Sequence, residues 1–192
     1  MKKAIEPSLE FYAQQIDFLL NKAISEPENR LQWVTLGSLN TAENGHEPDL
    51  RIVVLRGVDP ERNLLFYTDS RSPKMEQFKA NAKACILLFD QASMMQLRIY
   101  GEVLVDTQSE ECVKTIHDLT EQSRINYTTL EAPGTISSSK VILYDDRTIH
   151  FALLKFHSTK FDLLHLRREG ALRILANNAS DHQLDQLQWV TP

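Results

Sequence analysis

Hydrophobic and polar positions along the chain follow two different periods, and the first of them is helical. In residues 8–25 apolar side chains recur every three or four positions, which is the spacing of one face of an amphipathic helix. Ser8 stands where the N-cap of this helix is expected. The same reasoning predicts a second helix over 109–124, with Ser109 as its N-cap, and a short helix over 72–81.

Most of the remaining chain shows the two-residue alternation or the short apolar runs of β-strands. The predicted strands are 31–40, 50–58, 63–69, 83–90, 95–106, 141–146, 149–156, 161–167, 171–176 and 187–192. The link 59–62 is a turn-forming sequence, so the strands on either side of it are expected to form a β-hairpin. Gly101 interrupts the longest strand and indicates a β-bulge or a close approach of another backbone.

Strands joined mainly by hairpins favour antiparallel pairing, and closure into a small barrel leaves few open edges. Helices do not alternate with strands, and no G-x-G-x-x-G follows a first strand, which disfavours a parallel dinucleotide-binding sheet. No linker or repeat divides the chain. We therefore expect one domain over 1–192, mainly β with peripheral helices (α+β). It combines an N-terminal helix at about 8–25 with an antiparallel barrel over about 31–192.

Composition narrows the function. The 192 residues carry a net charge of -5, which argues against broad nucleic-acid binding. No apolar run approaches the roughly 20 residues that span a bilayer, and the N-terminus lacks the apolar core of a signal peptide. Cys85 and Cys112 lack metal-ligand spacing, so we expect two reduced thiols in a cytoplasmic protein, with a disulfide as the alternative. None of the six histidines has a partner at zinc spacing, and we expect no metal site.

A local cluster of cations contrasts with the acidic composition. It contains Arg51, Arg56, Arg71 and Lys74. Ser72 is the expected N-cap of the short helix, and free amides at a helix start attract anions. A cation in the first helical turn is unfavourable for the helix dipole alone, so Lys74 indicates a bound negative charge. The Thr68 hydroxyl and the Arg51 guanidinium would complete a site for a terminal phosphate. The alternative interpretation is ordinary surface charge that protects a strand edge.

The same segment resembles the pyridoxamine 5'-phosphate oxidase family. RIVVLR at 51–56 is similar to the family's R-x-V-L-L-K, and FYT followed by S-x-K is similar to its F-Y-T-N and S-R-K. MQLRIYGEV at 95–103 is similar to R-Q-V-R-x-x-G. Near the C-terminus, KFHSTKFDLLHLR is similar to the family's E-F-W and R-L-H-D-R segment. The resemblance covers roughly 31–106 and, more loosely, 150–176.

This resemblance implies a split β-barrel of the FMN-binding type, assembled as a homodimer with FMN in a groove between the subunits. Arg51 and Lys74 would then bind the FMN phosphate, and Gln96 would reach the flavin from its strand. Arg167 would correspond to a flavin-contacting arginine near the C-terminus. The FMN-binding residues implied in this way are Arg51, Val53, Leu55, Arg56, Tyr67, Thr68, Ser72, Lys74, Gln96 and Arg167.

The substrate side departs from the family pattern. The family's substrate-contacting lysine is Arg56 here, and the first arginine of R-L-H-D-R is Leu163. The histidine is retained as His165, which is the candidate catalytic residue. Arg124 and Tyr127 are out of register with the family's phosphate-binding helix. We therefore expect an FMN-dependent oxidoreductase with an altered substrate pocket. The alternatives are a genuine pyridoxamine/pyridoxine 5'-phosphate oxidase and a non-catalytic flavin-binding module.

Overall fold

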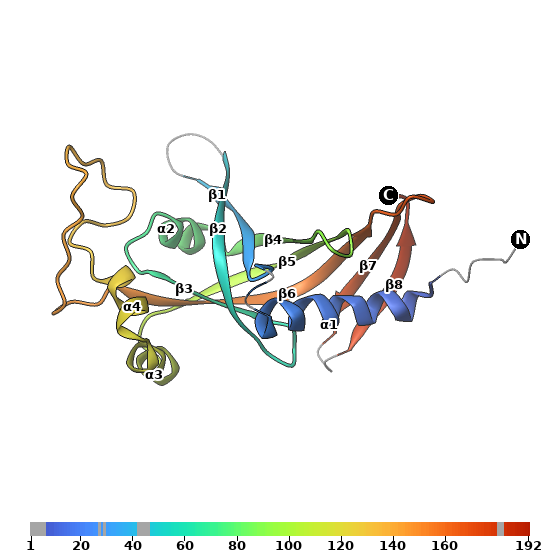
Figure 1. Cartoon of the computed structure of the whole chain (residues 1–192), viewed down its shortest axis with the longest axis horizontal. Helices are drawn as coiled ribbons and strands as arrows, with labels where there is room; N and C mark the ends of the chain where they lie inside the picture. The colour runs from blue at the N-terminus through green and yellow to red at the C-terminus, as the bar shows by residue number, and fades with distance from the viewer. Residues whose placement is uncertain (1–6, 27, 29, 42–46, 180–182) are drawn as a thin grey trace, which may run out of the picture.

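The computed structural model of the protein describes residues 7–26, 28, 30–41, 47–179 and 183–192. Its strands are β1 (Trp33–Asn40), β2 (Glu47–Val58), β3 (Leu64–Asp69), β4 (Lys83–Asp90), β5 (Met95–Asp106), β6 (Phe151–His165), β7 (Leu172–Asn178) and β8 (Leu184–Val190). They form one antiparallel sheet in the order β3-β2-β1-β4-β5-β6-β7-β8, and β3 also pairs with β6. This extra pairing closes six strands into a barrel, while β7 and β8 extend from it (Figure 1).

Strand β6 allows this split because its two halves have different neighbours. Residues 151–156 pair with β3, and residues 160–165 pair with β7. Strand β5 accompanies both halves, and its register with β6 shifts between Tyr100 and Gly101. A side-chain carbon on Gly101 would overlap the backbone carbonyl of His157. The expected bulge with a close backbone approach is therefore confirmed.

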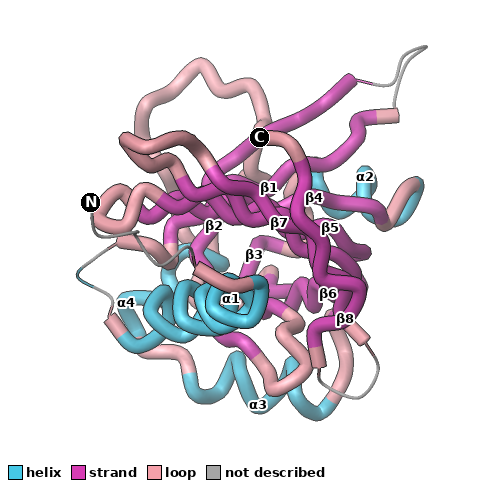
Figure 2. Tube along the Cα trace, turned by 90° about the vertical axis from the view of Figure 1, so that its right-hand side faces the viewer, coloured by secondary structure: helices cyan, strands magenta, loops and turns pink. Residues whose placement is uncertain are grey.

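The helices lie around the barrel and along its extension. They are α1 (Leu9–Ser25), α2 (Lys74–Ala80), α3 (Glu110–Asp118), α4 (Glu121–Arg124) and a 3-10 turn at Ile125–Tyr127. Helix α1 lies along the extension, whereas α3 and α4 lie at the opposite end of the molecule (Figures 1 and 2). The Ser8 hydroxyl accepts a hydrogen bond from the Phe11 amide at 3.2 Å, which confirms the expected N-cap.

Two predicted strands, 149–156 and 161–167, are in fact the single strand β6. The polar residues between them resemble a turn in the sequence. In the structure, Ser158 is buried and donates its hydroxyl hydrogen to the Arg62 carbonyl at 2.7 Å. The link between β2 and β3 therefore satisfies this polar side chain, and the strand continues without interruption.

Two further expectations are wrong in detail. The apolar run 141–146 is no strand, because it finds no sheet neighbour and makes only an isolated bridge from Tyr144 to Thr129. The predicted helix 109–124 divides into α3 and α4. Thr120 has extended backbone and its hydroxyl accepts from the Ser123 amide, so a new helix begins there. The cap at Ser109 is confirmed.

Candidate functional site

A cluster of cations and hydroxyl groups lies where β3 ends and α2 begins. The Lys74 Nζ donates to the Thr68 Oγ1 at 2.8 Å and to the Ser72 Oγ at 2.9 Å. Beside it, Arg51 donates to the Ser38 hydroxyl at 2.6 Å and, through Nη2, to the side-chain carbonyl of Gln77 at 2.9 Å. The structure therefore brings together four of the residues that the sequence proposed for a phosphate, namely Arg51, Thr68, Ser72 and Lys74. We call these four residues the anion cluster.

The electrostatics of the anion cluster favour a bound anion. Burial lowers the pKa of Lys74, and the nearby charge of Arg51 lowers it further. Among the described residues, the Lys74 amine contacts two hydroxyls and no carboxylate. Asp49 forms its ion pair with Arg51 instead. Two cations with hydroxyl donors around them match the donors that a phosphate requires, so the residues fit the phosphate of a cofactor.

Ser72 lies in the anion cluster, but it is not the N-cap that the sequence predicted. It does not cap α2: Pro73 precedes the first helical residue, and no side chain caps the helix. The Ser72 hydroxyl donates instead to the Asp69 carbonyl at 2.9 Å. The turn uses the hydroxyl to hold its own shape, and the oxygen is left to accept from Lys74.

Tyr67 and Arg56 point to the other face of the sheet, because neighbouring residues of a strand alternate between faces. The Arg56 guanidinium lies over the Tyr67 ring, 5.5 Å from its centre. Together with Ser123, Tyr127 and Asp118 they line a pocket of about 320 Å³ against α3 and α4. Burial raises the pKa of both tyrosines, so the pocket presents neutral phenol groups at physiological pH. The sequence had left Tyr127 out of register, but the fold brings it here.

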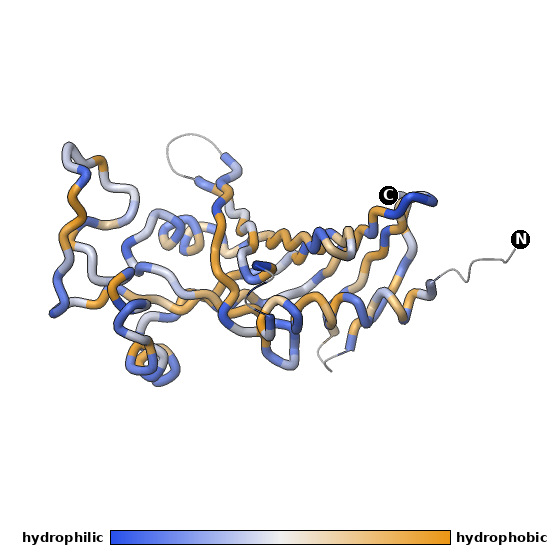
Figure 3. The backbone as a smooth tube through the Cα atoms, in the orientation of Figure 1, coloured by the Kyte–Doolittle hydropathy of each residue, from blue (hydrophilic) through white to orange (hydrophobic). Residues whose placement is uncertain are grey.

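Val53 and Leu55 follow Arg51 on the same face of β2. Leu55 is buried, and both residues join the barrel core, which appears as hydrophobic strand segments in Figure 3. Backbone groups of these residues remain candidates for contact with a flavin, whereas the Leu55 side chain is committed to packing.

The remaining candidates lie at the far end of β6. The start of this strand pairs with the anion-cluster end of β3, through Phe151 and Asp69. Its end pairs with the start of β5, where Gln96 faces Leu164. Strand β6 is 15 residues long, which corresponds to about 45 Å from end to end. Along β6, His165 and the following Arg167 therefore lie at the end far from Phe151. Across β1 and β4, Arg51 shares a row with Ile99, three residues after Gln96, and the described residues show no contact between Gln96 and the anion cluster.

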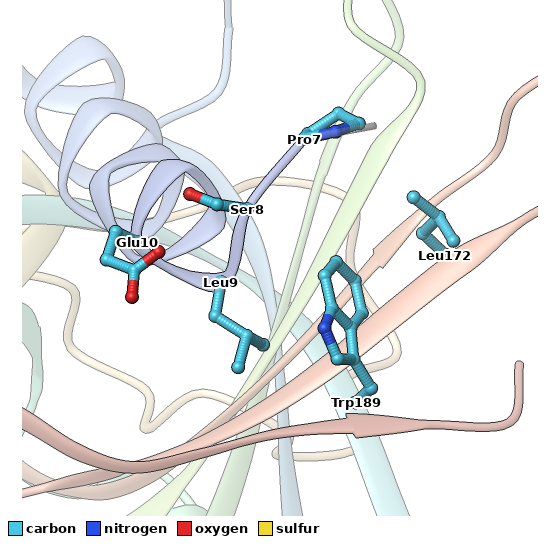
Figure 4. Close-up of a pocket in the computed structure, with 6 residues that line it drawn as sticks. All are labelled: Pro7, Ser8, Leu9, Glu10, Leu172 and Trp189. Carbon is cyan, nitrogen blue, oxygen red and sulfur yellow. The ribbon is translucent and has the colours of Figure 1, made fainter. Parts of the chain in front are cut away.

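His165 contacts helix α1. Its Nδ1 and the buried hydroxyl of Tyr12 are 2.8 Å apart. Burial lowers the pKa of His165, and the charge of Arg167 adds to this. Trp189 packs edge-on against Tyr12 and lines a groove of about 440 Å³, with its ring near Leu9 in Figure 4. The catalytic role of His165 stays a prediction, and the observed contacts are those of a residue that anchors α1.

Cys85 is half-buried and Cys112 is buried, and both are free thiols, as expected. Across the described ranges, no group of histidine, cysteine and acidic side chains is arranged to hold a metal ion. None of the helices in those ranges has the length and apolarity needed to cross a membrane.

The eight-stranded antiparallel sheet, closed by the pairing of β3 with β6, has the architecture of the FMN-binding split-barrel proteins. Residues 13–107 match the family model described as "Pyridoxamine 5'-phosphate oxidase, FMN-binding domain". The chain belongs to this pyridoxamine 5'-phosphate oxidase-like family, and the matched segment is its FMN-binding domain.

Two curated relatives are similar to part of this chain in sequence. A pyridoxine/pyridoxamine 5'-phosphate oxidase of Bordetella petrii is 32% identical over 114 residues, which cover 59% of this chain and 50% of the relative. One of Pseudomonas paraeruginosa is 37% identical over 73 residues, 38% of this chain and 34% of the relative. The matched segment thus spans half or less of the length of these curated relatives.

Two solved structures share the fold over nearly the whole chain. A pyridoxamine 5'-phosphate oxidase-related, FMN binding protein of Nostoc punctiforme has a TM-score of 0.75 at 19% identity, covering 99% of this chain and 100% of its own. PhzG of Burkholderia lata, solved with tetrahydrophenazine-1-carboxylic acid, has a TM-score of 0.72 at 13% identity, covering 99% and 98%. At these identities the likeness shows the fold alone.

Sequence reasoning missed the groups that hold Arg51 in place. Ser38 reaches it only through the pairing of β1 with β2, in which Ser38 and Asp49 are direct partners. Gln77 could have been found, because it lies three positions after Lys74 and so on the same side of α2. Its amide also donates to Asp49 at 2.8 Å, so Gln77 links Arg51 and its carboxylate partner.

Proposed function

We propose that this protein is an FMN-dependent oxidoreductase whose substrate pocket differs from that of pyridoxamine 5'-phosphate oxidase. The observation that carries the proposal is the anion cluster, in which the Lys74 amine has hydroxyl partners but no carboxylate partner among the described residues. A phosphate would supply the missing negative charge. The family match supports FMN as the molecule that brings this phosphate.

Arg51 and Lys74 would hold the phosphate, and the hydroxyls of Thr68 and Ser72 would orient it. Bound FMN supplies the electron transfer, so the protein needs no acid–base triad of its own. Its tasks are to bind the cofactor, to orient it and to exclude water. Ser38 and Gln77 orient the Arg51 guanidinium, and Asp49 already pairs with it. Lys74 would therefore supply the uncompensated positive charge that the phosphate meets.

The pocket beside Arg56 is the proposed substrate site. It combines one arginine, two neutral tyrosines, hydroxyl groups and the carboxylate of Asp118. The position of the family's arginine holds Leu163, which is only 1% exposed and packs in the core. The Asp118 carboxylate lines the pocket and would repel a phosphate, so the pocket favours a small polar substrate with less negative charge than a phosphate ester. Oxidation of pyridoxamine or pyridoxine 5'-phosphate is the second candidate function, because the curated relatives carry that name.

A homodimer would bring the dispersed residues into one site. Within the described part of one chain, Gln96 and Arg167 make no contact with Lys74 and lie at the end of β6 that is far from Phe151, and a second copy would supply them. This supports a flavin groove between two subunits, with each end of the chain contributing to one of two equivalent sites. The two free thiols support a cytoplasmic location.

The test begins with the visible spectrum of the purified protein and mass spectrometry of any ligand released by heat. We expect a yellow protein that releases FMN. Lys74→Ala removes a charge-assisted hydrogen-bond donor and should weaken FMN binding about 10- to 100-fold in a fluorescence titration. Lys79→Ala is the matched control, because Lys79 lies on the same helix but is exposed and paired with Glu76.

Two outcomes would contradict this function. A colourless protein that takes up no added FMN would remove the oxidoreductase proposal. Equal FMN affinity of the Lys74→Ala and Lys79→Ala variants would remove the phosphate assignment. If the flavin binds, anaerobic mixing with reduced nicotinamide or with pyridoxamine 5'-phosphate decides the substrate. Bleaching by the nicotinamide alone supports the altered pocket, and bleaching by the vitamin phosphate alone supports the second candidate.

A further inference from the structure

Arg71 stands in the turn that carries the anion cluster, yet its guanidinium is occupied elsewhere. It forms a two-point contact with the Asp69 carboxylate, from Nε at 3.1 Å and from Nη2 at 2.7 Å. The same Nη2 donates to the backbone carbonyl of Thr129 at 2.8 Å, and Nη1 donates to that of Leu130 at 3.0 Å. All three nitrogens of the guanidinium are thus engaged, and none of these bonds is directed to the anion cluster.

The two carbonyls belong to a segment that we call the arm, residues 128–150, which projects from the barrel at its α4 end (Figure 1). Its base is closed by backbone hydrogen bonds from Leu130 to Leu143 at 2.9 Å and from Asp145 to Thr128 at 2.7 Å. Its outer part exposes apolar side chains, among them Ile136, which is 99% exposed. The arm therefore has little packing of its own to hold it in place.

Contacts with the β3–α2 turn hold the arm instead. The Ser70 amide donates to the His150 carbonyl at 3.2 Å, at the end of the arm. Gly134 lies against Pro73, so that a side-chain carbon there would be 3.3 Å from the proline ring. Arg71 supplies the side-chain hydrogen bonds of this contact, and they fall at the start of the arm.

The start of the arm follows directly on the proposed substrate pocket. Tyr127 lines that pocket and precedes the clamped Thr129 by two residues. On the other side, Arg71 precedes Lys74 of the anion cluster by three residues. One side chain thus connects the two halves of the proposed active site.

We propose that Arg71 is a positioning residue that locks the arm and the Tyr127 side of the pocket against the cofactor-phosphate turn. The inference rests on the proposed function. A second role follows from Asp69, whose side chain is only 5% exposed. The Ser72 hydroxyl donates to the Asp69 carbonyl and accepts from Lys74, each at 2.9 Å, so Asp69 and the Lys74 amine lie in the same turn. Without Arg71, the Asp69 carboxylate would compete with the phosphate for that amine. Arg71 thereby keeps Lys74 available.

Hydrogen–deuterium exchange of the full chain tests the clamp without any ligand. Arg71→Met should make the amides of Leu130, Asp145 and His150 exchange at least about tenfold faster, since a neutral side chain cannot bridge the two carbonyls. Amides of β5 should exchange as in the wild type, which shows that the fold persists. Arg147→Met, on the same arm but exposed, is the matched control and should leave the arm unchanged.

Titration with FMN and with riboflavin, which lacks the phosphate, tests the second role. Arg71→Met should weaken FMN about tenfold and leave riboflavin unchanged, whereas general loosening would affect both flavins. Adding Asp69→Asn should restore the FMN affinity but not the protection of the arm. If Asp69→Asn does not restore the FMN affinity, Arg71 contacts the phosphate directly. If the amides of the arm exchange in Arg71→Met as in the wild type, Arg71 does not hold the arm. A wild type that binds neither flavin refutes the proposed function, and the exchange experiment still decides the clamp.

Discussion

Lys74 carries the strongest residue-scale argument for a ligand. Removing an amine from water disfavours its charged form, and a second cation nearby does so again. Both effects lower the pKa of Lys74, and the carboxylates of Asp69 and Asp49 offset only part of the shift. Hydroxyl partners offset only part of this cost, because they bring no opposite charge. A side chain held in this way is typical of a site that is completed by an anion.

The pH dependence of FMN binding follows from this shift. In the free protein the pKa of Lys74 lies below its usual value of 10.5, whereas a bound phosphate would favour the charged amine. Above the free-protein pKa, binding must therefore take up a proton, and affinity should fall by up to about tenfold per pH unit. Fluorescence titrations between about pH 7 and about pH 10 measure this, a range in which the phosphate stays doubly charged.

Lys74→Gln is the control for that experiment. It keeps the length and polarity of the side chain but cannot titrate, so its weaker affinity should not vary over the same range. A wild-type profile as flat as that of Lys74→Gln would mean that the amine does not contact the phosphate.

The sequence predicted those parts of the site whose residues lie close together along the chain. Thr68, Ser72 and Lys74 lie within seven residues, and a hairpin brings Arg51 to them, so local patterns were sufficient. The direction of Arg71 could not be predicted, because the carbonyls that it binds lie 58 and 59 positions further along the chain. From the sequence alone, Arg71 could not be told apart from a phosphate-binding residue, because it lies among other cations.

At the scale of elements, β5 and β6 show how a local irregularity shapes the barrel. The bulge at Gly101 bends β5 where β6 changes its other neighbour from β3 to β7. The sequence predicted the bulge, because Gly101 interrupts a long strand pattern. The sequence did not predict the continuity of β6, because the burial of Ser158 depends on the Arg62 carbonyl of a distant turn.

Gly101→Ala should destabilise the protein by about 1–3 kcal/mol. Its methyl group would overlap a backbone carbonyl of β6, and a backbone cannot move aside as a flexible side chain does. Urea unfolding followed by circular dichroism measures the change. Gly57→Ala is the matched control in β2, because its methyl group would meet Leu65 at an ordinary 3.6 Å and should cost less than about 1 kcal/mol. Equal stability of both variants would show that the bulge tolerates a side chain.

At the scale of the whole molecule, the outer face of the sheet exposes a set of apolar side chains. Register places one apolar set on this face, across β1, β2 and β4. Its most exposed members are Trp33 at 60%, Leu50 at 68%, Ile52 at 59% and Phe89 at 45%. Sequence alternation predicted a barrel, but it could not show which of the two faces stays uncovered. A continuous exposed apolar face of this kind is typical of a protein interface.

Ile52→Asp tests the dimer that would unite the two ends of β6. Wild type should have a mass of about 44 kDa by light scattering, twice the 22.0 kDa of one chain, and Ile52→Asp should have half of it. A carboxylate buried in an apolar interface without a partner would oppose association. The variant should also lose FMN, since Lys74 of one copy would no longer meet Gln96 of the other. Val113→Asp, at a similarly exposed apolar position on α3, should leave both properties unchanged. A monomeric wild type with full FMN affinity would show that one chain builds the cofactor site alone, and Gln96 and Arg167 would then leave it.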